Sequence, residues 1–329
     1  MRTITFTQAV NEALREEMLR DRSVYILGFG LYWGFGGPGP TSGLLEEFGA
    51  SRVRTTPLSE TAITGSCVGA ALAGMRPVAQ LGLADFVFCA LDEIISKAGK
   101  WRYTHGANAG MTLPIVFLET IGGYVSGASE HSQSPLGLYM HAPGLKLAVP
   151  TTPYDAKGLL KTAIRDDNPV LFFMHKRLMR DEGPVPEEEY TVPFGLADIR
   201  REGRDVTVVA TAYMVSLALR AAAALEEQGV SVEIIDPRTL EPLDMEAIVR
   251  SVRKTGRLVV VDEDTERCGV GAEIGVQVVE RAFDALKAPV QRVANPNLPV
   301  PYSRPLERAV LPSKEKIEEA ILHTLAAPA

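Results

Sequence analysis

Cysteine is scarce in this sequence, and features that mark several protein classes are missing. Only three cysteines occur among 329 residues, widely separated and without a C-x-x-C spacing, so neither a disulfide framework nor a thiolate zinc site is indicated. The formal net charge is −7, and no basic run suits a nucleic acid or a membrane surface. The most apolar region, residues 78–95, is interrupted by acids, and the N-terminus lacks an apolar signal core. We therefore expect a protein of the reducing cytoplasm.

The local signatures of several enzyme classes are also absent. The sequence contains no G-x-x-x-x-G-K-[ST], no G-x-S-x-G and no H-E-x-x-H, so P-loop, α/β-hydrolase and zincin chemistry are not indicated. Two glycine-rich stretches, residues 28–40 and 269–275, follow expected strands but miss the third glycine of a dinucleotide fingerprint. We interpret the first stretch as a structured loop.

Length and pattern predict two α/β domains. A chain of 329 residues exceeds the usual size of a single core. Short apolar runs alternate with helical segments up to residue 180 and again from residue 195, which predicts mostly parallel sheets with helices on both faces. Thr5-x-x-Gln8 predicts a capping box for the first helix, and a single helix is expected over residues 85–103. The charged, proline-bearing segment 181–194 is the expected linker.

The sequence around Glu60 joins an expected strand to an expected helix. Pro57 ends the strand at residues 52–55, and Ser59 is the expected N-cap, which places Glu60 in the first helical turn. The helix dipole favours a carboxylate at that position. Glu60 is therefore either an ordinary first-turn acid or a functional one, and the local sequence leaves both open.

Two other stretches have a functional interpretation beside a structural one. His131 lies in a polar loop, residues 127–134, after an expected parallel strand, where ligands of such sheets collect, although many loop histidines are structural or merely exposed. Residues 163–169 read as a helix end with a proline stop. Their carbonyls, with the side-chain oxygens of Asp166 and Asn168, equally suit a hard cation.

Five motifs together point to one family: Thr56–Glu60, Val68–Pro77, Glu130–Gln133, Ala163–Val170 and Gly269–Ile274. In this order they resemble the beta subunit of the thiamine-diphosphate-dependent 2-oxo acid dehydrogenases, whose members act on pyruvate, branched-chain 2-oxo acids or acetoin. The resemblance runs nearly end to end. It implies a transketolase-like pyrimidine-binding domain over residues 1–180, a linker over 181–194 and a transketolase C-terminal domain over 195–329.

The resemblance also implies roles for individual residues. Glu60 matches the glutamate that hydrogen-bonds the pyrimidine ring of thiamine diphosphate, and His131 matches an active-site histidine suited to proton transfer or to guiding the acyl acceptor. Leu58 and Phe86 match cofactor-binding positions, with Phe86 stacking on the aminopyrimidine. A structural potassium site is implied by matches at Ile115, Ala163, Ile164, Asp166 and Asn168.

One family motif is missing from this chain. The diphosphate is held through Mg²⁺ by a Gly-Asp-Gly motif on the family's alpha subunit, and no Gly-Asp-Gly occurs here. We therefore expect half an active site, completed by an alpha subunit in a heterotetramer of two alpha and two beta chains, with a lipoyl acyltransferase component as acyl acceptor. The alternatives are a split transketolase-like or acyloin-forming thiamine enzyme without a lipoyl acceptor, and a non-catalytic stabilising subunit.

The sequence departs from the family pattern near the expected substrate pocket. Phe29 stands where many relatives have an acid of the proton path between active sites, and residues 117–123 lack the usual arginine and proline. The aromatic residues of the first glycine-rich loop are Phe29, Tyr32, Trp33 and Phe35. They form either a local apolar cluster or an apolar wall that would favour a branched or aromatic 2-oxo acid over pyruvate.

Overall fold

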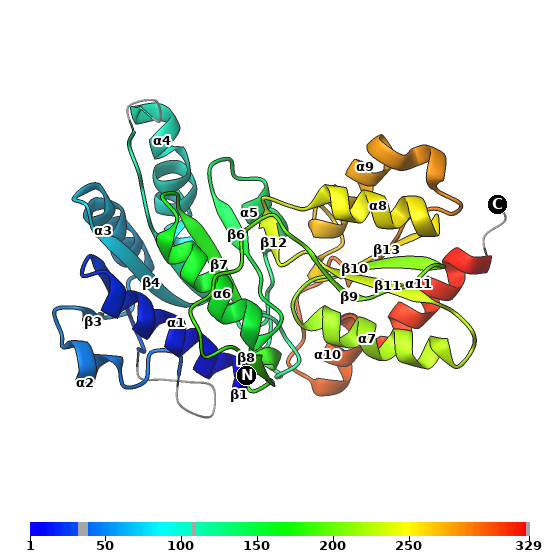
Figure 1. Cartoon of the computed structure of the whole chain (residues 1–329), viewed down its shortest axis with the longest axis horizontal. Coiled ribbons are helices and arrows are strands. Elements are labelled where there is room, and N and C mark those ends of the chain that lie inside the picture. Colours follow the sequence, from blue (N-terminus) through cyan, green and yellow to red (C-terminus); the bar gives the residue numbers. More distant parts are fainter. Residues whose placement is uncertain (32–38, 107–109, 327–329) are drawn as a thin grey trace. The chain divides into compact units, whose positions relative to one another are not determined.

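The computed structural model describes residues 1–31, 39–106 and 110–326, which form two compact α/β units (Figure 1). The first unit contains Met1–Ile121 and Tyr139–Phe194. The second contains Gly122–Leu138 and Gly195–Ala329. Segment 122–138, which carries His131, therefore follows a strand of the first unit in sequence but packs with the second.

The first unit is built on a parallel sheet. Its strands are β2 (Val24–Gly28), β3 (Val53–Thr55), β4 (Arg76–Leu83), β5 (Val116–Ile121), β6 (Lys146–Ala148) and β7 (Val170–His175). They lie in the order β6-β7-β5-β4-β2-β3, and every neighbouring pair in that order is parallel. Strands β5 and β7 are buried along their whole length, as strands of a sheet covered on both faces are. The predicted parallel α/β architecture is confirmed.

Helices cover both faces of this sheet. They are α1 (Phe6–Arg20), α2 (Leu44–Phe48), α3 (Glu60–Leu72), α4 (Gly99–His105) and α6 (Pro153–Arg165). The short helix α5 (Leu136–Met140) has residues in both units. In Figure 1, α1 and α6 lie together on one face, while α3 and α4 lie on the other. The predicted capping box of α1 is confirmed, because the Thr5 hydroxyl accepts from the Gln8 N–H (3.2 Å) and Gln8 Oε1 accepts from the Thr5 N–H (2.8 Å).

The prediction of a single helix over residues 85–103 is wrong. The chain instead forms a 3₁₀ turn, η1 (Val87–Ala90), a π-helical stretch, η2 (Asp92–Ala98), and then α4. Apolar periodicity could not separate these forms, because helices with i+3, i+4 and i+5 hydrogen bonds bury similar stripes of side chains over so few turns.

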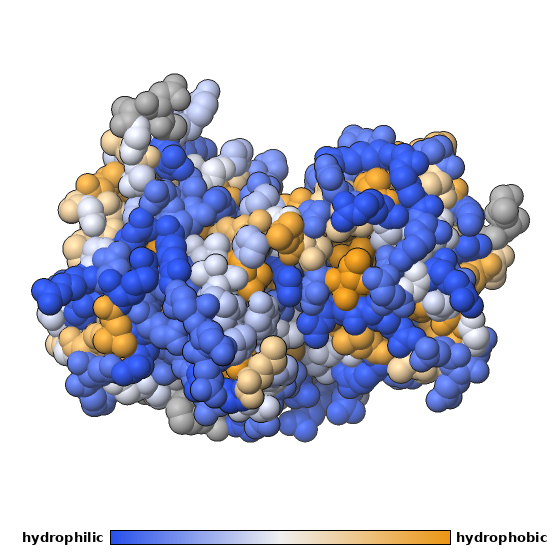
Figure 2. Space-filling view, in the orientation of Figure 1, coloured by the Kyte–Doolittle hydropathy of each residue, from blue (hydrophilic) through white to orange (hydrophobic). Residues whose placement is uncertain are grey.

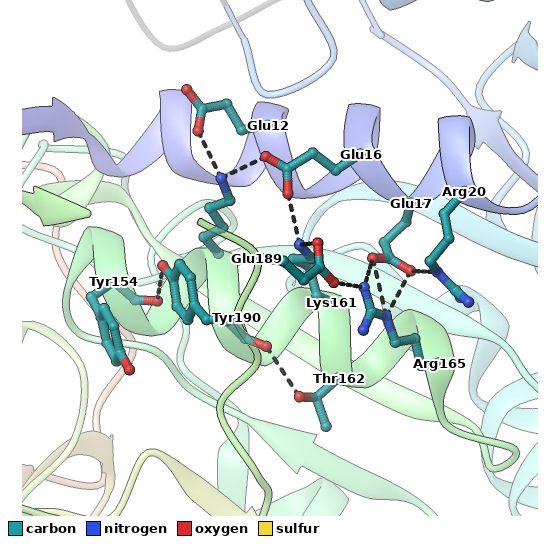
Figure 3. A network of polar contacts seen from close by, with 12 residues as sticks. Glu12, Glu16, Glu17, Arg20, Tyr154, Lys161, Thr162, Arg165, Glu189 and Tyr190 are labelled. Atoms are coloured by element: carbon teal, nitrogen blue, oxygen red, sulfur yellow. Dashed lines mark hydrogen bonds and ion pairs between the residues drawn. The ribbon is translucent and has the colours of Figure 1, made fainter. Parts of the chain in front are cut away.

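Charged side chains link α1 to α6 (Figure 3). Lys157 and Lys161 of α6 are almost completely buried, and both donate to Glu16 of α1, at 2.6 and 2.7 Å. Arg165 pairs with the fully buried Glu17 through Nη2 and Oε1 at 2.5 Å. The same lysine and arginine, Lys161 and Arg165, also bind Glu189.

Glu189 lies in the segment expected to be a linker, which packs on the first unit. Its start forms β8 (Glu182–Val185), antiparallel to β1 (Arg2–Thr5). Farther along, Tyr190 stacks on Tyr154 with 4.6 Å between ring centroids. The domain boundaries proposed from the sequence stay a prediction.

The second unit has its own sheet and core. Its strands are β9 (Asp198–Arg201), β10 (Val206–Ala210), β11 (Val232–Asp236), β13 (Leu258–Thr265) and β14 (Gln291–Asn295), in the order β14-β13-β10-β11-β9. All pairs are parallel except β9 with β11. The helices are α7 (Tyr213–Glu226), α8 (Met245–Thr255), α9 (Val270–Ala282), α10 (Arg304–Val310) and α11 (Lys314–Ala326). Aliphatic side chains of α7 and α11 pack on one face of the sheet, and α8 and α9 lie together on the other (Figure 1).

Hydrophilic residues cover most of the face seen in Figure 2, with smaller apolar areas among them. Within the described ranges, the helices lack the combination of length and apolar character that a membrane crossing requires.

Candidate active site

Glu60 is the first residue of α3, directly after the turn that follows β3. Ser59 occupies the N-cap position, as predicted, but its hydroxyl donates to the Pro57 carbonyl (3.1 Å) and does not cap the helix. The N–H groups of the first turn therefore have no side-chain acceptor from Ser59, and the positive end of the helix dipole lies beside the half-buried Glu60. Among the residues that the structure describes, Glu60 has no ion-pair partner, so its carboxylate can meet a ligand.

Phe86 begins a segment of the same unit that contacts the first turn of α3. It immediately precedes η1, and the hydroxyl of Thr61, the residue after Glu60, donates to the Cys89 carbonyl at 2.7 Å. This bond fixes the first turn of α3 against the segment that Phe86 begins. Leu58, in the turn before the helix, is 71 % exposed, although its side chain is apolar.

Glu60, Leu58 and Phe86 suit the aminopyrimidine half of thiamine diphosphate. A carboxylate can accept a hydrogen bond from a ring nitrogen and exchange a proton with it, while the apolar Leu58 and the half-buried ring of Phe86 can contact a flat heterocycle. The hydroxyl oxygen of Thr56, in the same turn, is buried and has no hydrogen-bond partner among the described residues. A polar atom left unsatisfied in this way is typical of a site that a ligand or water completes.

His131 is exposed and lies in segment 122–138 of the second unit, so the structure does not group it with Glu60. The Gly122 N–H donates to the Gln133 carbonyl (3.1 Å), which closes a loop, and the His131 N–H donates to the Ala128 carbonyl (3.3 Å). The polar loop predicted after β5 is therefore present.

Sequence reasoning missed the side chains that hold this loop. They are the carboxylates of Glu263 and Asp264, at the end of β13, and of Glu307 on α10. Three consecutive acids, Asp262 to Asp264, at the carboxyl end of a parallel strand were the available signal. Nothing in the local sequence distinguishes Glu307 from a surface glutamate.

The expected potassium ligands lie near one another but already have hydrogen-bond partners. The carbonyls of Ile164 and Asp166 both accept from Arg76 Nη1, at 3.0 Å each. The Ile115 carbonyl accepts from the Val170 N–H at 2.8 Å. A potassium ion bound to the Ile164 and Asp166 carbonyls would therefore share them with a guanidinium group.

Asp166 and Asn168 have strong partners as well. The Asp166 carboxylate pairs with Lys146 and accepts from the backbone N–H of Asn168 (2.8 Å), while the Asn168 side-chain oxygen accepts from Arg102. Burial acts to raise the Asp166 pKa, but the hydrogen bonds from Lys146 and Asn168 outweigh it, and the pKa lies below its ordinary value. Over the described ranges, no group of three or more His, Cys, Asp or Glu side chains is arranged to hold a metal ion.

Phe29 is the member of the aromatic group that the structure describes, because Tyr32, Trp33 and Phe35 lie outside the described residues. Its ring packs against Gly82 of β4, where a Cβ atom would approach Phe29 Cζ to 2.7 Å. The interpretation of the whole group as an apolar cluster or wall stays a prediction.

Residues 2–182 match the family model of the transketolase pyrimidine-binding domain, and residues 195–317 match that of the transketolase C-terminal domain. The beta subunit of acetoin:2,6-dichlorophenolindophenol oxidoreductase from Bacillus subtilis is 43 % identical, with 100 % of this chain and 99 % of the relative covered. The beta subunit of 2-oxoisovalerate dehydrogenase from the same organism is 44 % identical, with 98 % of each chain covered. The pyruvate dehydrogenase E1 beta subunit of Rhizobium meliloti is 41 % identical, over 98 % of this chain and 70 % of the relative.

A solved structure of a split-gene transketolase, described as an inactive beta4 tetramer, superposes with a TM-score of 0.80 at 22 % identity and covers 99 % of each chain. This likeness shows the shared fold. The sequence relatives show more, because they are similar over nearly the whole chain and all are beta subunits of one enzyme group. The chain therefore belongs to the transketolase-like family of beta subunits of the thiamine-diphosphate-dependent 2-oxo acid and acetoin dehydrogenases.

Proposed function

We propose that this chain is the beta subunit of a heterotetramer of two alpha and two beta chains that oxidatively decarboxylates a 2-oxo acid, or cleaves acetoin, and passes the acyl group to a lipoyl acyltransferase partner. The observation that supports it most is Glu60 at the uncapped start of α3, with Leu58 and Phe86 in adjoining segments. The names of the relatives, from acetoin oxidoreductase to pyruvate dehydrogenase, support the substrate class.

In this proposal the chain's own side chains bind and orient the cofactor. Thiamine diphosphate, when bound, supplies the carbon nucleophile and the electron sink. Glu60 holds a ring nitrogen of the pyrimidine and accepts and returns one proton there. Leu58 and Phe86 contact the ring and exclude water from it. His131 moves a proton near the reacting carbon or guides the incoming acyl acceptor.

The proposal also covers the ligands of the diphosphate and Mg²⁺, the potassium site and the cellular compartment. The alpha subunit supplies the Mg²⁺ ligands and holds the diphosphate, since this sequence has no Gly-Asp-Gly. The potassium site of this proposal comprises Ile115, Ala163, Ile164, Asp166 and Asn168, of which the Ile164 and Asp166 carbonyls also accept from Arg76. The three cysteines are free thiols, as a reducing compartment would leave them, and we place the complex in the cytoplasm.

Cofactor binding tests the division of the site between two chains. Calorimetry with thiamine diphosphate and Mg²⁺ should detect tight binding to the complex reconstituted with its alpha subunit. It should detect none to the beta chain alone, because the diphosphate ligands are absent. Micromolar binding to the isolated beta chain would contradict the proposal.

The reaction itself is tested on the reconstituted complex. Pyruvate, branched and aromatic 2-oxo acids and acetoin are supplied with an artificial electron acceptor, and then with a lipoyl protein. We expect turnover of at least one of them with both acceptors. Turnover of ketose donors alone, with no 2-oxo acid or acetoin consumed, would instead support the split transketolase-like enzyme.

A further inference from the structure

The loop that carries His131 is held by three carboxylates, two from the end of β13 and one from α10, which lie far from the loop in the sequence. Glu307 Oε1 accepts from the backbone N–H groups of Val125 (3.2 Å) and Ser126 (3.0 Å), and its Oε2 accepts from Ser126 at 3.2 Å. At the two ends of the segment, Glu263 accepts from the Gly123 N–H and Asp264 accepts from the Gly137 N–H (2.6 Å).

These carboxylates are buried. Glu307, Glu263 and Asp264 are 2 %, 5 % and 9 % exposed. Hydrogen bonds from backbone N–H groups to an ionised carboxylate are short and about twice as strong as neutral ones, and they gain further strength away from bulk water. Each buried carboxylate is therefore a strong anchor for the backbone that it meets.

The loop needs such anchors because its backbone is strained. Tyr124, Ser126 and Ala128 have φ values of 63°, 56° and 61°, in the left-handed region that non-glycine residues avoid. Such residues keep this conformation only where their surroundings impose it. Glu307 binds the N–H of one of them, Ser126, and the Tyr124 hydroxyl donates to the Pro312 carbonyl (2.9 Å) just beyond α10.

The approach of the loop to its anchors is also close. A Cβ atom on Gly137 would lie 2.9 Å from Asp264 Oδ2 and 2.6 Å from the Cys268 carbonyl oxygen. A Cβ atom on Gly123 would lie 2.8 Å from Leu311 Cδ1, which follows α10. A side chain at position 137 would therefore clash with backbone, and one at position 123 would have to displace the Leu311 side chain.

We propose that Glu307 is a positioning residue for the reaction, which acts with Glu263 and Asp264 to fix the backbone of residues 123–137 and thereby the place of the His131 imidazole. This inference rests on the proposed function, because His131 has its role there. A purely structural role for Glu307 would stabilise the fold without altering the step that His131 serves.

Hydrogen exchange and kinetics on the reconstituted heterotetramer test the two parts of the inference. Glu307→Ala should raise amide exchange in residues 122–138 selectively and lower kcat about tenfold with a smaller change in KM. Glu307→Gln keeps one carbonyl acceptor and should fall between the wild type and Glu307→Ala. The matched control is Glu280→Ala, which removes an exposed glutamate from α9 and should change neither quantity.

Combining Glu307→Ala with His131→Ala separates positioning from general stabilisation. If Glu307 acts through His131, then Glu307→Ala should lower kcat by less than about twofold when His131 is already alanine. If the two substitutions lowered kcat additively in the double variant, the positioning role would be overturned. Raised amide exchange in Glu307→Ala with an unchanged kcat would overturn it as well. Unchanged amide exchange of residues 122–138 in Glu307→Ala would show that Glu307 does not anchor the loop.

The exchange measurement needs no substrate, so it also separates this inference from the proposed function. If the wild-type complex turned over none of the substrates, the proposed function would fail, while raised exchange would still support the anchor and unchanged exchange would overturn it. If Glu307→Ala does not assemble, Glu307→Gln and Glu263→Gln provide the same comparison.

Discussion

Lys161 Nζ lies 2.7 Å from Glu16 Oε2, and the lysine side chain is fully buried where α6 meets α1. Its second partner, Glu189, lies at the same distance (Figure 3). The two carboxylates are 32 % and 62 % exposed, so the network is asymmetric, with the cation buried and its anions reaching water. Removal of the lysine leaves two acids that can hydrate, whereas removal of an acid leaves a buried cation with one partner fewer.

Lys161→Ala should lower the free energy of unfolding of the beta chain by about 2 kcal/mol, less than the full penalty for breaking a buried pair because the two acids remain partly solvated. Lys161→Met, which keeps the apolar stem, should recover part of the loss. Urea unfolding measures both. The control is Arg253→Ala, which breaks the exposed pair with Asp284 and a hydrogen bond to the Arg281 carbonyl, and it should change the free energy far less than Lys161→Ala does. Equal effects of Lys161→Ala and Arg253→Ala would show that burial adds nothing to the network.

The pH dependence of stability should have two limbs. Burial, and then the charge of Asp264, raises the pKa of Asp262 to about 8, and burial raises the pKa of Asp264 to about 6, against 3.8 in the unfolded chain. At these two carboxyls the folded state binds more protons than the unfolded state between pH 3.8 and the raised pKa values. Their contribution to stability is therefore lost as pH rises through about 6 and about 8.

The acid limb has the opposite sign. Hydrogen bonds from Lys161 and Arg165 lower the pKa of Glu189 to about 2, below its ordinary 4.5, so its contribution is lost as pH falls from 4.5 toward 2. The midpoint of thermal unfolding of the beta chain, measured between pH 3 and pH 9, should therefore peak in weakly acidic buffer. A midpoint that rises steadily from pH 6 to pH 8 would contradict the raised pKa values of the two aspartates.

Glu60→Gln should preserve the heterotetramer and lower kcat by at least about a hundredfold, because an amide cannot accept and return the proton that Glu60 exchanges with the cofactor. Activity assays and sedimentation of the reconstituted complex measure the two effects. Glu246→Gln is the matched control, since Glu246 is an exposed glutamate in the first turn of α8. Near-normal turnover of Glu60→Gln would reduce Glu60 to an acid that only complements the helix dipole.

Local features of the fold could be predicted because neighbouring residues determine them. The capping box at Thr5 and Gln8 and the place of Glu60 at the start of α3 follow from a few consecutive residues. The apolar runs of the parallel strands are equally local.

Contacts between distant residues could not be predicted in the same way. Strand β8 pairs with β1, and Glu307 binds the backbone of Val125. In both cases the partners are separated by more than half of the chain. Neither partner has a sequence feature that indicates which residue it will contact. The anchors of the His131 loop therefore became visible only in the folded chain.

Glu119 is a second feature that only the fold makes visible. It lies on β5, fully buried, in register with Gly82 of β4 and Phe173 of β7. Both of its carboxyl oxygens lack a hydrogen-bond partner among the described residues, as does the buried hydroxyl of Tyr139. Burial raises the pKa of Glu119 well above its ordinary value, and burial followed by the charge of Glu119 raises the pKa of Tyr139. Burial therefore favours the neutral, protonated form of this carboxyl.

Glu119→Leu should raise the free energy of unfolding of the beta chain by about 1–3 kcal/mol, because it replaces a buried carboxyl without hydrogen-bond partners in the described part of the chain by an apolar side chain of similar size. The gain should grow with pH, since a raised pKa means that the folded wild type loses stability as the solution becomes more basic. Glu119→Gln, which keeps the polar atoms but cannot ionise, should show neither the full gain nor the dependence on pH. Urea unfolding at pH 6 and pH 8 measures both variants. A loss of stability in Glu119→Leu would mean that the folded protein holds the carboxyl through a hydrogen bond, and Glu119 would then be a polar element of the core.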